Sequence, residues 1–260
     1  MLILKDLQKT FAPGTVNEKK ALQGIDLQLQ SGDFVTVLGA NGAGKSTLFG
    51  AISGSFLPDK GSILLDGHDI TRMPDYKRSK VIGQLFQNPL RGTAPNMTIQ
   101  ENLALAYLRA SVSRSPFSMI TGKDRQQFRE KLSLLGLGLE DRMDTPVGLL
   151  SGGQRQALTL LMATLVTPKL LLLDEHTAAL DPATAEKVLD LTQKIVAENH
   201  ITCMMITHSI PDALRLGNRT IVMKDGRIHL SLEDTQRRNM TPQQLLTAFQ
   251  VESDRMLFST

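Results

Sequence analysis

The chain has 260 residues, and 41% of them are hydrophobic, which is enough for a substantial core in one large domain or two closely joined lobes. Its 29 basic and 26 acidic side chains leave a formal charge of only +3. Such a small excess permits a nucleic-acid or membrane-surface partner but does not require one. A mixed, solvated surface is the simpler interpretation of this charge.

Cys203 is the only cysteine, which excludes an intramolecular disulfide and favours a reducing compartment. It lies in the apolar run ITCMMI, so we expect a buried, inert thiol. The N-terminal MLILKDLQ is too short an apolar stretch for a signal peptide, and no segment approaches the ~20 apolar residues that span a bilayer. We therefore expect a soluble chain in the cytoplasm.

Strand patterns alternate with helix patterns over much of the chain. Residues 25–30 alternate like a half-buried strand, and residues 34–38 form a continuous apolar run, typical of a central strand, before a helix from about Lys45. Asp181 is the expected N-cap of a helix in which Pro182 takes the first position. This alternation predicts an α/β fold with a mostly parallel sheet. Further buried strands are predicted at 169–173, 201–206 and 219–223.

The stretch from about residue 88 to 165 is instead helical in pattern. Thr98 and Glu101 fit a capping box that opens TIQENLALAYLRA. A second helix is predicted around DRQQFREKLSLLG, after a loop near SVSRSPFS at 111–118. We interpret this stretch as a helical lobe inserted into the α/β domain, and we expect one further short helix at 241–249.

A glycine-rich stretch, GANGAGKST, fits the pattern G-x-x-x-x-G-K-[ST] between a buried strand and a helix. Its glycines let backbone N–H groups close around phosphate oxygens, and the following helix adds its dipole. We expect Lys45 to reach the β- and γ-phosphates and the Ser46 hydroxyl to bind Mg²⁺. An ordinary glycine-rich turn is the alternative, but motif and context agree on a nucleoside triphosphate site. The residues expected to bind the nucleotide here are Gly39, Asn41, Gly42, Ala43, Gly44, Lys45, Ser46 and Thr47.

Two carboxylates end the apolar run LLLL at 170–173. Asp174, at the end of a buried strand, is suited to hold Mg²⁺ through water, because an ion that bridges phosphates takes only one or two carboxylates. Glu175 is then free to act as the general base on the water that attacks the γ-phosphate. A carboxylate pair that merely caps the next turn is the plainer alternative.

LLSGGQRQ, at 149–156, opens an amphipathic helix with a second anion-binding turn. One triphosphate does not need two cradles from the same chain. The economical interpretation is that this turn completes the ATP site of a second copy.

With these motifs, the sequence resembles the nucleotide-binding subunits of ATP-binding cassette transporters over essentially its whole length. The resemblance rests on motifs in the family's order: GANGAGKST, Gln87 in LFQNP, LSGGQ at 150–154, LLLLDE at 170–175, AALD at 178–181 and His208 in ITHS. It implies a P-loop NTPase with a RecA-like core, an antiparallel β subdomain and an inserted helical subdomain. The implied division is one domain, with core and β lobes at 1–87 and 166–260 and the helical lobe at 88–165.

The resemblance also implies roles for single residues. Phe11 matches the aromatic residue that stacks on adenine, with a plain core phenylalanine as the alternative. Gln87 matches the residue that contacts Mg²⁺ and links the site to the helical lobe. His208 matches the switch histidine that hydrogen-bonds the γ-phosphate. Further matches are Ser151, Gly153 and Gln154, which grip the γ-phosphate of the opposite subunit, and Asp181, which couples the two sites.

The mechanism implied by the resemblance has two ATP molecules between two head-to-tail copies, whose closure and separation drive membrane-embedded permease subunits. It places the protein at the cytoplasmic face of the membrane. DEHTAALDP looks like the ATPase subunits of bacterial importers that work with a substrate-binding protein, in particular those for amino acids such as tryptophan or tyrosine. An exporter subunit remains open. A soluble cassette acting on nucleic acid or ribosomes is less favoured, because the chain has one cassette and only 4% aromatic residues.

Two features depart from the commonest family pattern. The residue after the catalytic glutamate is usually proline, whereas here it is His176, which we expect to be a surface substitution, with tuning of the base as the alternative. The loop PGTVNEKKA at 13–21 is longer and more polar than in compact relatives, and we interpret it as a solvated hairpin. No catalytic group is missing, since Lys45, Asp174, Glu175 and His208 are all present, and this argues against an inactive binding module.

Overall fold

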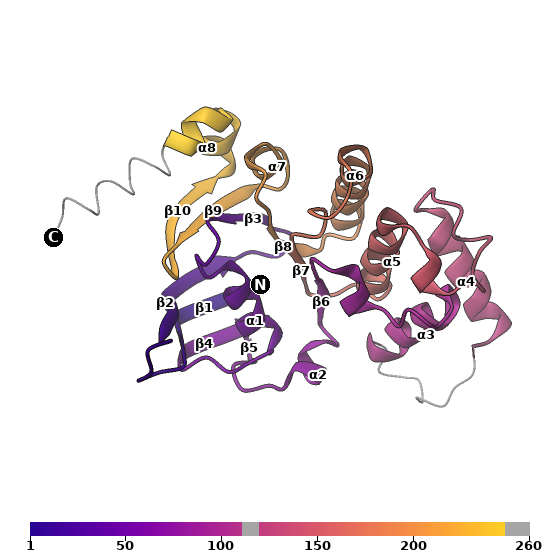
Figure 1. Cartoon of the computed structure of the whole chain (residues 1–260), viewed down its shortest axis with the longest axis horizontal. Coiled ribbons are helices and arrows are strands. Elements are labelled where there is room, and N and C mark those ends of the chain that lie inside the picture. Colours follow the sequence, from indigo (N-terminus) through magenta and orange to yellow (C-terminus); the bar gives the residue numbers. More distant parts are fainter. Residues whose placement is uncertain (111–119, 248–260) are drawn as a thin grey trace. The chain divides into compact units, whose positions relative to one another are not determined.

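The computed structural model describes residues 1–110 and 120–247. Two compact units make up this part of the chain (Figure 1). The first joins Met1–Pro74 to the described part of Thr202–Thr260, and the second is Asp75–Ile201. The predicted helical lobe, residues 88–165, lies within the second unit. No helix among the described residues is long and apolar enough to cross a bilayer.

One sheet of the first unit is antiparallel throughout, as Figure 1 shows at the N-terminal end of the chain. Its order is β2 (Lys19–Leu29), β1 (Leu2–Phe11), β4 (Lys60–Leu65) and β5 (His68–Asp69). Alternate apolar side chains of these strands are buried, which is the pattern of a sheet with one face in the core. This is the antiparallel β subdomain that the resemblance implied.

A second set of strands in the same unit carries the glycine-rich loop. β3 (Phe34–Gly39) lies between β8 (Thr202–Ile206) and β9 (Arg219–Lys224) and runs parallel to both. β10 (Arg227–Glu233) pairs antiparallel with β9. Because β3 has neighbours on both sides, its residues are almost wholly buried, as its continuous apolar run predicts. The helices of this unit are α1 (Lys45–Ser53), α7 (Ile210–Arg215) and α8 (Asp234–Arg238).

The second unit combines a parallel strand pair with a group of helices. β6 (Ile82–Leu85) pairs with β7 (Leu170–Asp174), with Leu85 opposite Leu173. Leucine, isoleucine and phenylalanine side chains from the helices at Ile99–Ala110, Gly122–Ser133 and Gly152–Thr164 form the core of the helical part, with Phe128 and Leu158 at most 2% exposed. The helices are α2 (Asp75–Arg78), α3 (Ile99–Ala110), α4 (Gly122–Ser133), α5 (Gly152–Thr164) and α6 (Pro182–Glu198), with 3-10 turns η1 (Pro89–Gly92) and η2 (Val147–Leu149).

Most predicted elements are present with small shifts at their ends, but the strand expected at 25–30 starts six residues earlier, at Lys19, and ends at Leu29. The strands expected at 169–173, 201–206 and 219–223 are Leu170–Asp174, Thr202–Ile206 and Arg219–Lys224. The Thr98–Glu101 capping box is formed, with the Thr98 amide 2.7 Å from the Glu101 carboxylate. The expected helix at 241–249 is helical from 242 to 247, and its last two residues lie outside the described part, as does the predicted loop at 111–118.

Candidate nucleotide site

The glycine-rich loop connects the buried end of β3 to the first turn of α1. Gly39, Gly42 and Gly44 all have φ between +84° and +153°, a region that residues with a side chain rarely adopt. A Cβ on Gly44 would lie 2.5 Å from the Ala21 carbonyl oxygen, and one on Gly39 would lie 2.4 Å from that of Met223. The two glycines therefore let the loop lie directly on the neighbouring backbone.

Lys45 begins α1, and its ammonium folds back over this loop. Nζ donates to the carbonyl oxygens of Gly39 at 2.8 Å and Ala40 at 3.1 Å, and the residue is 5% exposed. Ser46, the next residue, is exposed. This arrangement fits a phosphate with its bound cation. The Lys45 ammonium and the N-terminus of α1 attract the phosphate, and the exposed Ser46 hydroxyl can bind the cation.

Phe11 ends β1, and its ring is 39% exposed, so it is not the plain core residue that was the alternative. The ring packs edge-to-face on Phe56, with centroids 5.3 Å apart. The ammonium of Lys9 lies 5.6 Å from both centroids. Phe11 is thus a supported aromatic ring with a free surface, suited to stack on a base.

The predicted solvated hairpin brings one further charge to the loop. β1 and β2 pair across it with Phe11 opposite Lys19, and residues 12–18 are exposed, as expected. Lys19 Nζ lies 3.5 Å from the point that a Cβ on Gly42 would occupy. No pattern in the sequence predicts this approach, because Lys19 belongs to no motif and only the register of the hairpin directs it to the glycine-rich loop.

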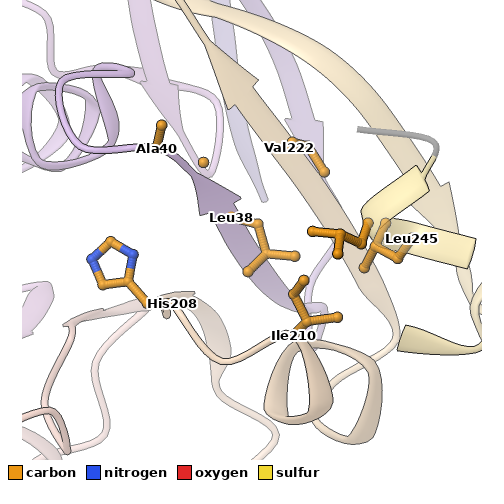
Figure 2. Close-up of a pocket in the computed structure, with 8 residues that line it drawn as sticks. Leu38, Ala40, His208, Ile210, Val222 and Leu245 are labelled. Atoms are coloured by element: carbon orange, nitrogen blue, oxygen red, sulfur yellow. The ribbon is translucent and has the colours of Figure 1, made fainter. Parts of the chain in front are cut away.

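His208 lies two residues beyond β8, whose Ile206 pairs with Val37 of β3. Because parallel strands end at the same edge, this register brings His208 beside the start of the glycine-rich loop. His208, Gly39 and Ala40 line one part of a cavity of about 200 Å³, and Figure 2 shows Leu245 at its opposite side. The other lining residues are Leu38, Ile210, Val222 and Leu246.

In the second unit, Asp174 and Glu175 follow the buried leucines of β7, and both are half-buried. Glu175 has φ +47° although it carries a side chain. Gln87 lies two residues beyond Leu85, and Glu175 two residues beyond the opposite Leu173, so the strand register brings them together. Gln87 Nε2 donates to Glu175 Oε2 at 3.2 Å. The pair that the motifs predicted separately therefore forms one hydrogen-bonded group.

The signature turn caps α5. The Ser151 hydroxyl accepts from the Gln154 amide at 3.2 Å, and the Gln154 side chain accepts from the Ser151 amide at 3.1 Å. Gly153 packs against α6, where a Cβ would lie 2.2 Å from the Thr184 methyl group. Arg155 holds the preceding turn by donating to the carbonyl oxygens of Val147, Gly148 and Leu150. The sequence motifs did not predict this role.

Asp181 is the N-cap of α6, as predicted, and its Oδ1 accepts from the Thr184 amide at 3.0 Å. Hydrogen bonds from the Thr184 side chain and amide hold the pKa of Asp181 below its ordinary value. The residue is therefore a carboxylate at neutral pH, exposed at the start of the helix.

The expectation that His176 lies at the surface is wrong. It is 2% exposed, and its Nε2 lies 3.2 Å from the Thr192 hydroxyl of α6. Burial lowers the pKa of His176 to about 4, so the imidazole is neutral at physiological pH. The sequence pattern DEHTAALD contains nothing that reports burial, because the contact is with a helix residue sixteen positions away.

Comparison with known proteins places these features in a family. The model of the family described as ABC transporter matches residues 22–178. The chain belongs to the ABC transporter family.

A tyrosine transport ATP-binding protein of Clostridioides difficile is 39% identical over 96% of this chain and 99% of its own length. A bicarbonate transport ATP-binding protein of Synechococcus elongatus is 36% identical over 86% of this chain, which spans only 32% of that protein. An ATP-binding cassette solved as a dimer in a post-hydrolysis state with ADP and Pi has a TM-score of 0.78 at 29% identity, covering 90% of this chain and 99% of that one. This protein is accordingly an ATP-binding ATPase with the P-loop fold that the resemblance implied.

Proposed function

We propose that this ABC ATPase powers import of a small solute, an amino acid with an aromatic side chain, through membrane permease subunits at the cytoplasmic face. The full-length 39% identity to a tyrosine transport protein carries this proposal. A bicarbonate transport protein is 36% identical, so related cassettes serve different solutes, and we infer that the membrane partners set the specificity. A substrate-binding protein would act through the permease and not on this chain.

At the phosphates, the residues present fit ATP with Mg²⁺. Gly39 and Gly44 lie where a Cβ would clash with neighbouring backbone, and Gly42 has φ +84°, so the three glycines allow the loop its cradle conformation. We infer that Lys45 binds the β- and γ-phosphates, with the other loop residues donating backbone amides. Ser46, Asp174 and Gln87 offer the oxygen ligands that Mg²⁺ prefers, and the bound ion would neutralise charge on the phosphates. Phe11 is proposed to stack on adenine.

The reaction is an in-line attack of water on the γ-phosphorus, which forms one P–O bond and breaks the bond to the β–γ bridging oxygen. Glu175 accepts the proton of the attacking water, and ADP and phosphate leave. Lys45 and His208 stabilise the negative charge on the γ-phosphoryl oxygens. The hydrogen bond from Gln87 orients the Glu175 carboxylate, which supports this assignment of roles.

Two copies are proposed to enclose two ATP molecules head to tail. Ser151, Gly153 and Gln154 of one copy then contact the γ-phosphate bound by the other, and Asp181 couples the two sites. The solved dimer of a 29% identical cassette supports this arrangement. ATP acts as a ligand of the interface, because it stabilises only the closed state.

The substitution Glu175→Gln tests the chemistry. It keeps the shape of the side chain and removes the base, so we expect ATP hydrolysis to fall at least ~10²-fold while ATP still drives dimerisation. Dimers are measured by light scattering with and without Mg-ATP. Glu198→Gln, at an exposed position near the end of α6, is the matched control and retains hydrolysis. Normal turnover by Glu175→Gln would show that another group is the base.

Partner identification tests the transport role. The tagged chain is purified from gently solubilised membranes, and its partners are identified by mass spectrometry. We expect a multi-span permease together with a binding protein, whose ligand is then sought among aromatic amino acids by calorimetry. Reproducible recovery of ribosomes or soluble partners alone would leave the ATPase assignment intact and refute the transport role.

A further inference from the structure

His176 is wholly enclosed yet lies next to the proposed base. Its exposed fraction is 2%, and its ring nitrogen Nε2 lies 3.2 Å from Thr192 Oγ1. Thr192 is itself 0% exposed, and its hydroxyl donates to the Val188 carbonyl oxygen at 2.7 Å. A hydroxyl has a single proton, so Thr192 Oγ1 accepts the other bond and His176 Nε2–H donates it. The geometry thus assigns the Nε2–H tautomer and a fixed direction of donation.

This bond anchors a short loop with an unusual backbone. Glu175, immediately before His176, adopts φ +47°, which is unfavourable for a residue with a side chain. The loop then turns through two hydrogen bonds, from the Ala178 amide to the Glu175 carbonyl at 3.0 Å and from the Leu180 amide to the Thr177 carbonyl at 3.1 Å. Such a conformation persists only where the surroundings hold it.

Helix α6 holds this loop at both ends. At the far end, Asp181 caps the helix by accepting from the Thr184 amide at 3.0 Å. At the near end, His176 reaches the middle of the helix through Thr192. Between these anchors the loop has only four residues, which leaves the backbone at Glu175 little freedom.

We propose that His176 is a positioning residue, whose hydrogen bond to Thr192 fixes the backbone turn that presents the Glu175 carboxylate to Gln87 and to the attacking water. It acts on the rate of the chemical step and does not touch the nucleotide. The inference rests on the proposed role of Glu175 as base. It distinguishes His176 from a core histidine that only fills space, since positioning changes kcat and leaves ATP affinity intact.

Four variants test the proposal in the full-length protein. His176→Leu removes the donor and keeps most of the volume, and Thr192→Val removes the acceptor with the same shape. His176→Gln restores an N–H donor at a similar reach. Thr159→Val is the matched control, because Thr159 is also a buried helix threonine whose hydroxyl bonds a carbonyl oxygen of its own helix, Gln156 at 2.8 Å.

The measurements are steady-state Mg-ATP hydrolysis, ATP binding and thermal unfolding of every variant. We expect His176→Leu and Thr192→Val each to lower kcat roughly 10–100-fold, as a small displacement of a catalytic group does, with KM for ATP changed less than about 3-fold. The double variant, His176→Leu with Thr192→Val, should lose no more kcat than the worse single variant, because both changes break the same hydrogen bond. His176→Gln recovers most of kcat, and Thr159→Val hydrolyses ATP like the wild type.

Three outcomes would overturn the inference. The first is a normal kcat in Thr192→Val, which remains informative if His176→Leu does not fold. The second is additive losses in the double variant, and the third is a loss in kcat that simply follows the loss in melting temperature across all four variants. Glu175→Gln, measured in parallel, separates this inference from the proposed function. If Glu175→Gln does not hydrolyse ATP and Thr192→Val hydrolyses it at the wild-type rate, the inference alone fails. If Glu175→Gln hydrolyses ATP at the wild-type rate, Glu175 is not the base, and the inference fails with that assignment.

Discussion

Replacement of Arg237 by methionine is expected to destabilise the unit that contains the glycine-rich loop. Arg237 extends from α8, is 3% exposed, and donates to four carbonyl oxygens around the end of α7. The last carbonyl groups of a helix lack partners within it, so this guanidinium replaces the missing donors. α7 starts two residues after His208, so the clamp holds the helix that follows the segment carrying His208.

The magnitude follows from which carbonyl groups lose their donor. Ala213 keeps a hydroxyl donor, because the Thr36 and Thr220 hydroxyls both lie 3.0 Å from its oxygen and only one of them is engaged in donating to the other, at 2.8 Å. The carbonyl groups of Leu214, Leu216 and Gly217 depend on Arg237, at 3.1, 2.5 and 2.7 Å.

The bond to Leu216 is buried and those to Leu214 and Gly217 are part-buried, so at about 1 kcal/mol for each acceptor left without a donor the loss is at most about 3 kcal/mol. For a protein of this size that corresponds to a decrease of roughly 6–12 °C in Tm. The assay is urea unfolding of the nucleotide-free protein, followed by far-UV circular dichroism, with calorimetry for Tm. Arg227→Met, at an exposed position of β10, is the control and should change stability by less than ~0.5 kcal/mol. A loss below ~1 kcal/mol for Arg237→Met would refute the reasoning, because it would mean that water or a shifted side chain replaces the clamp.

Three further results are expected. Burial raises the pKa of the Cys203 thiol, so a thiol-specific reagent at pH 8 should label native protein only as fast as it unfolds, and rapid native labelling would contradict this. Phe128→Ala removes a 2% exposed ring from the core of the helical part and should cost about 3–5 kcal/mol in urea unfolding, whereas Leu134→Ala, 63% exposed, should cost little. The pKa of His176 is about 4 in the folded protein, against an ordinary value of 6.5. The unfolded chain therefore binds the proton more readily, and the stability that is present above pH 6.5 is lost as the pH falls towards 4. From pH 7 to 5 the wild type should lose about 2 kcal/mol more than His176→Leu, and parallel stability curves would contradict the burial of this ring.

Local chemistry explains why much of the site was predictable. A glycine with positive φ, a capping serine or a capping aspartate needs only its immediate neighbours, so the loop at 39–47 and the caps at Ser151 and Asp181 follow from short patterns. Buried parallel strands such as β3 and β7 are also visible as continuous apolar runs. Strand register then brings Gln87 to Glu175 without any further signal.

What depended on distant contacts was not predictable in the same way. β1 was not assigned from its own sequence, since its alternation is interrupted at Asp6, which has φ +44°, and its register shifts there against both β2 and β4. A bulge of this kind breaks the period of two that marks a strand. The approach of Lys19 was not predicted and the burial of His176 was predicted wrongly for a related reason, because each residue is polar and flanked by exposed or mixed positions, and only a tertiary neighbour decides what it contacts.

The motif residues in the second unit also have ordinary structural duties, and this limits what a motif alone can say about chemistry. Ser151 and Gln154 complete a capping box, and Asp181 caps α6, whether or not a nucleotide is present. Removing a cap costs about 1 kcal/mol by itself, so an alanine at any of these positions weakens the helix and the proposed phosphate contact together. Glu175 differs, because its carboxylate accepts from Gln87 and the residue beside it, His176, is bonded to α6 through Thr192. Five other described residues with side chains share its left-handed φ, so the anchored carboxylate, and not the backbone strain alone, is the feature that supports the proposed chemistry.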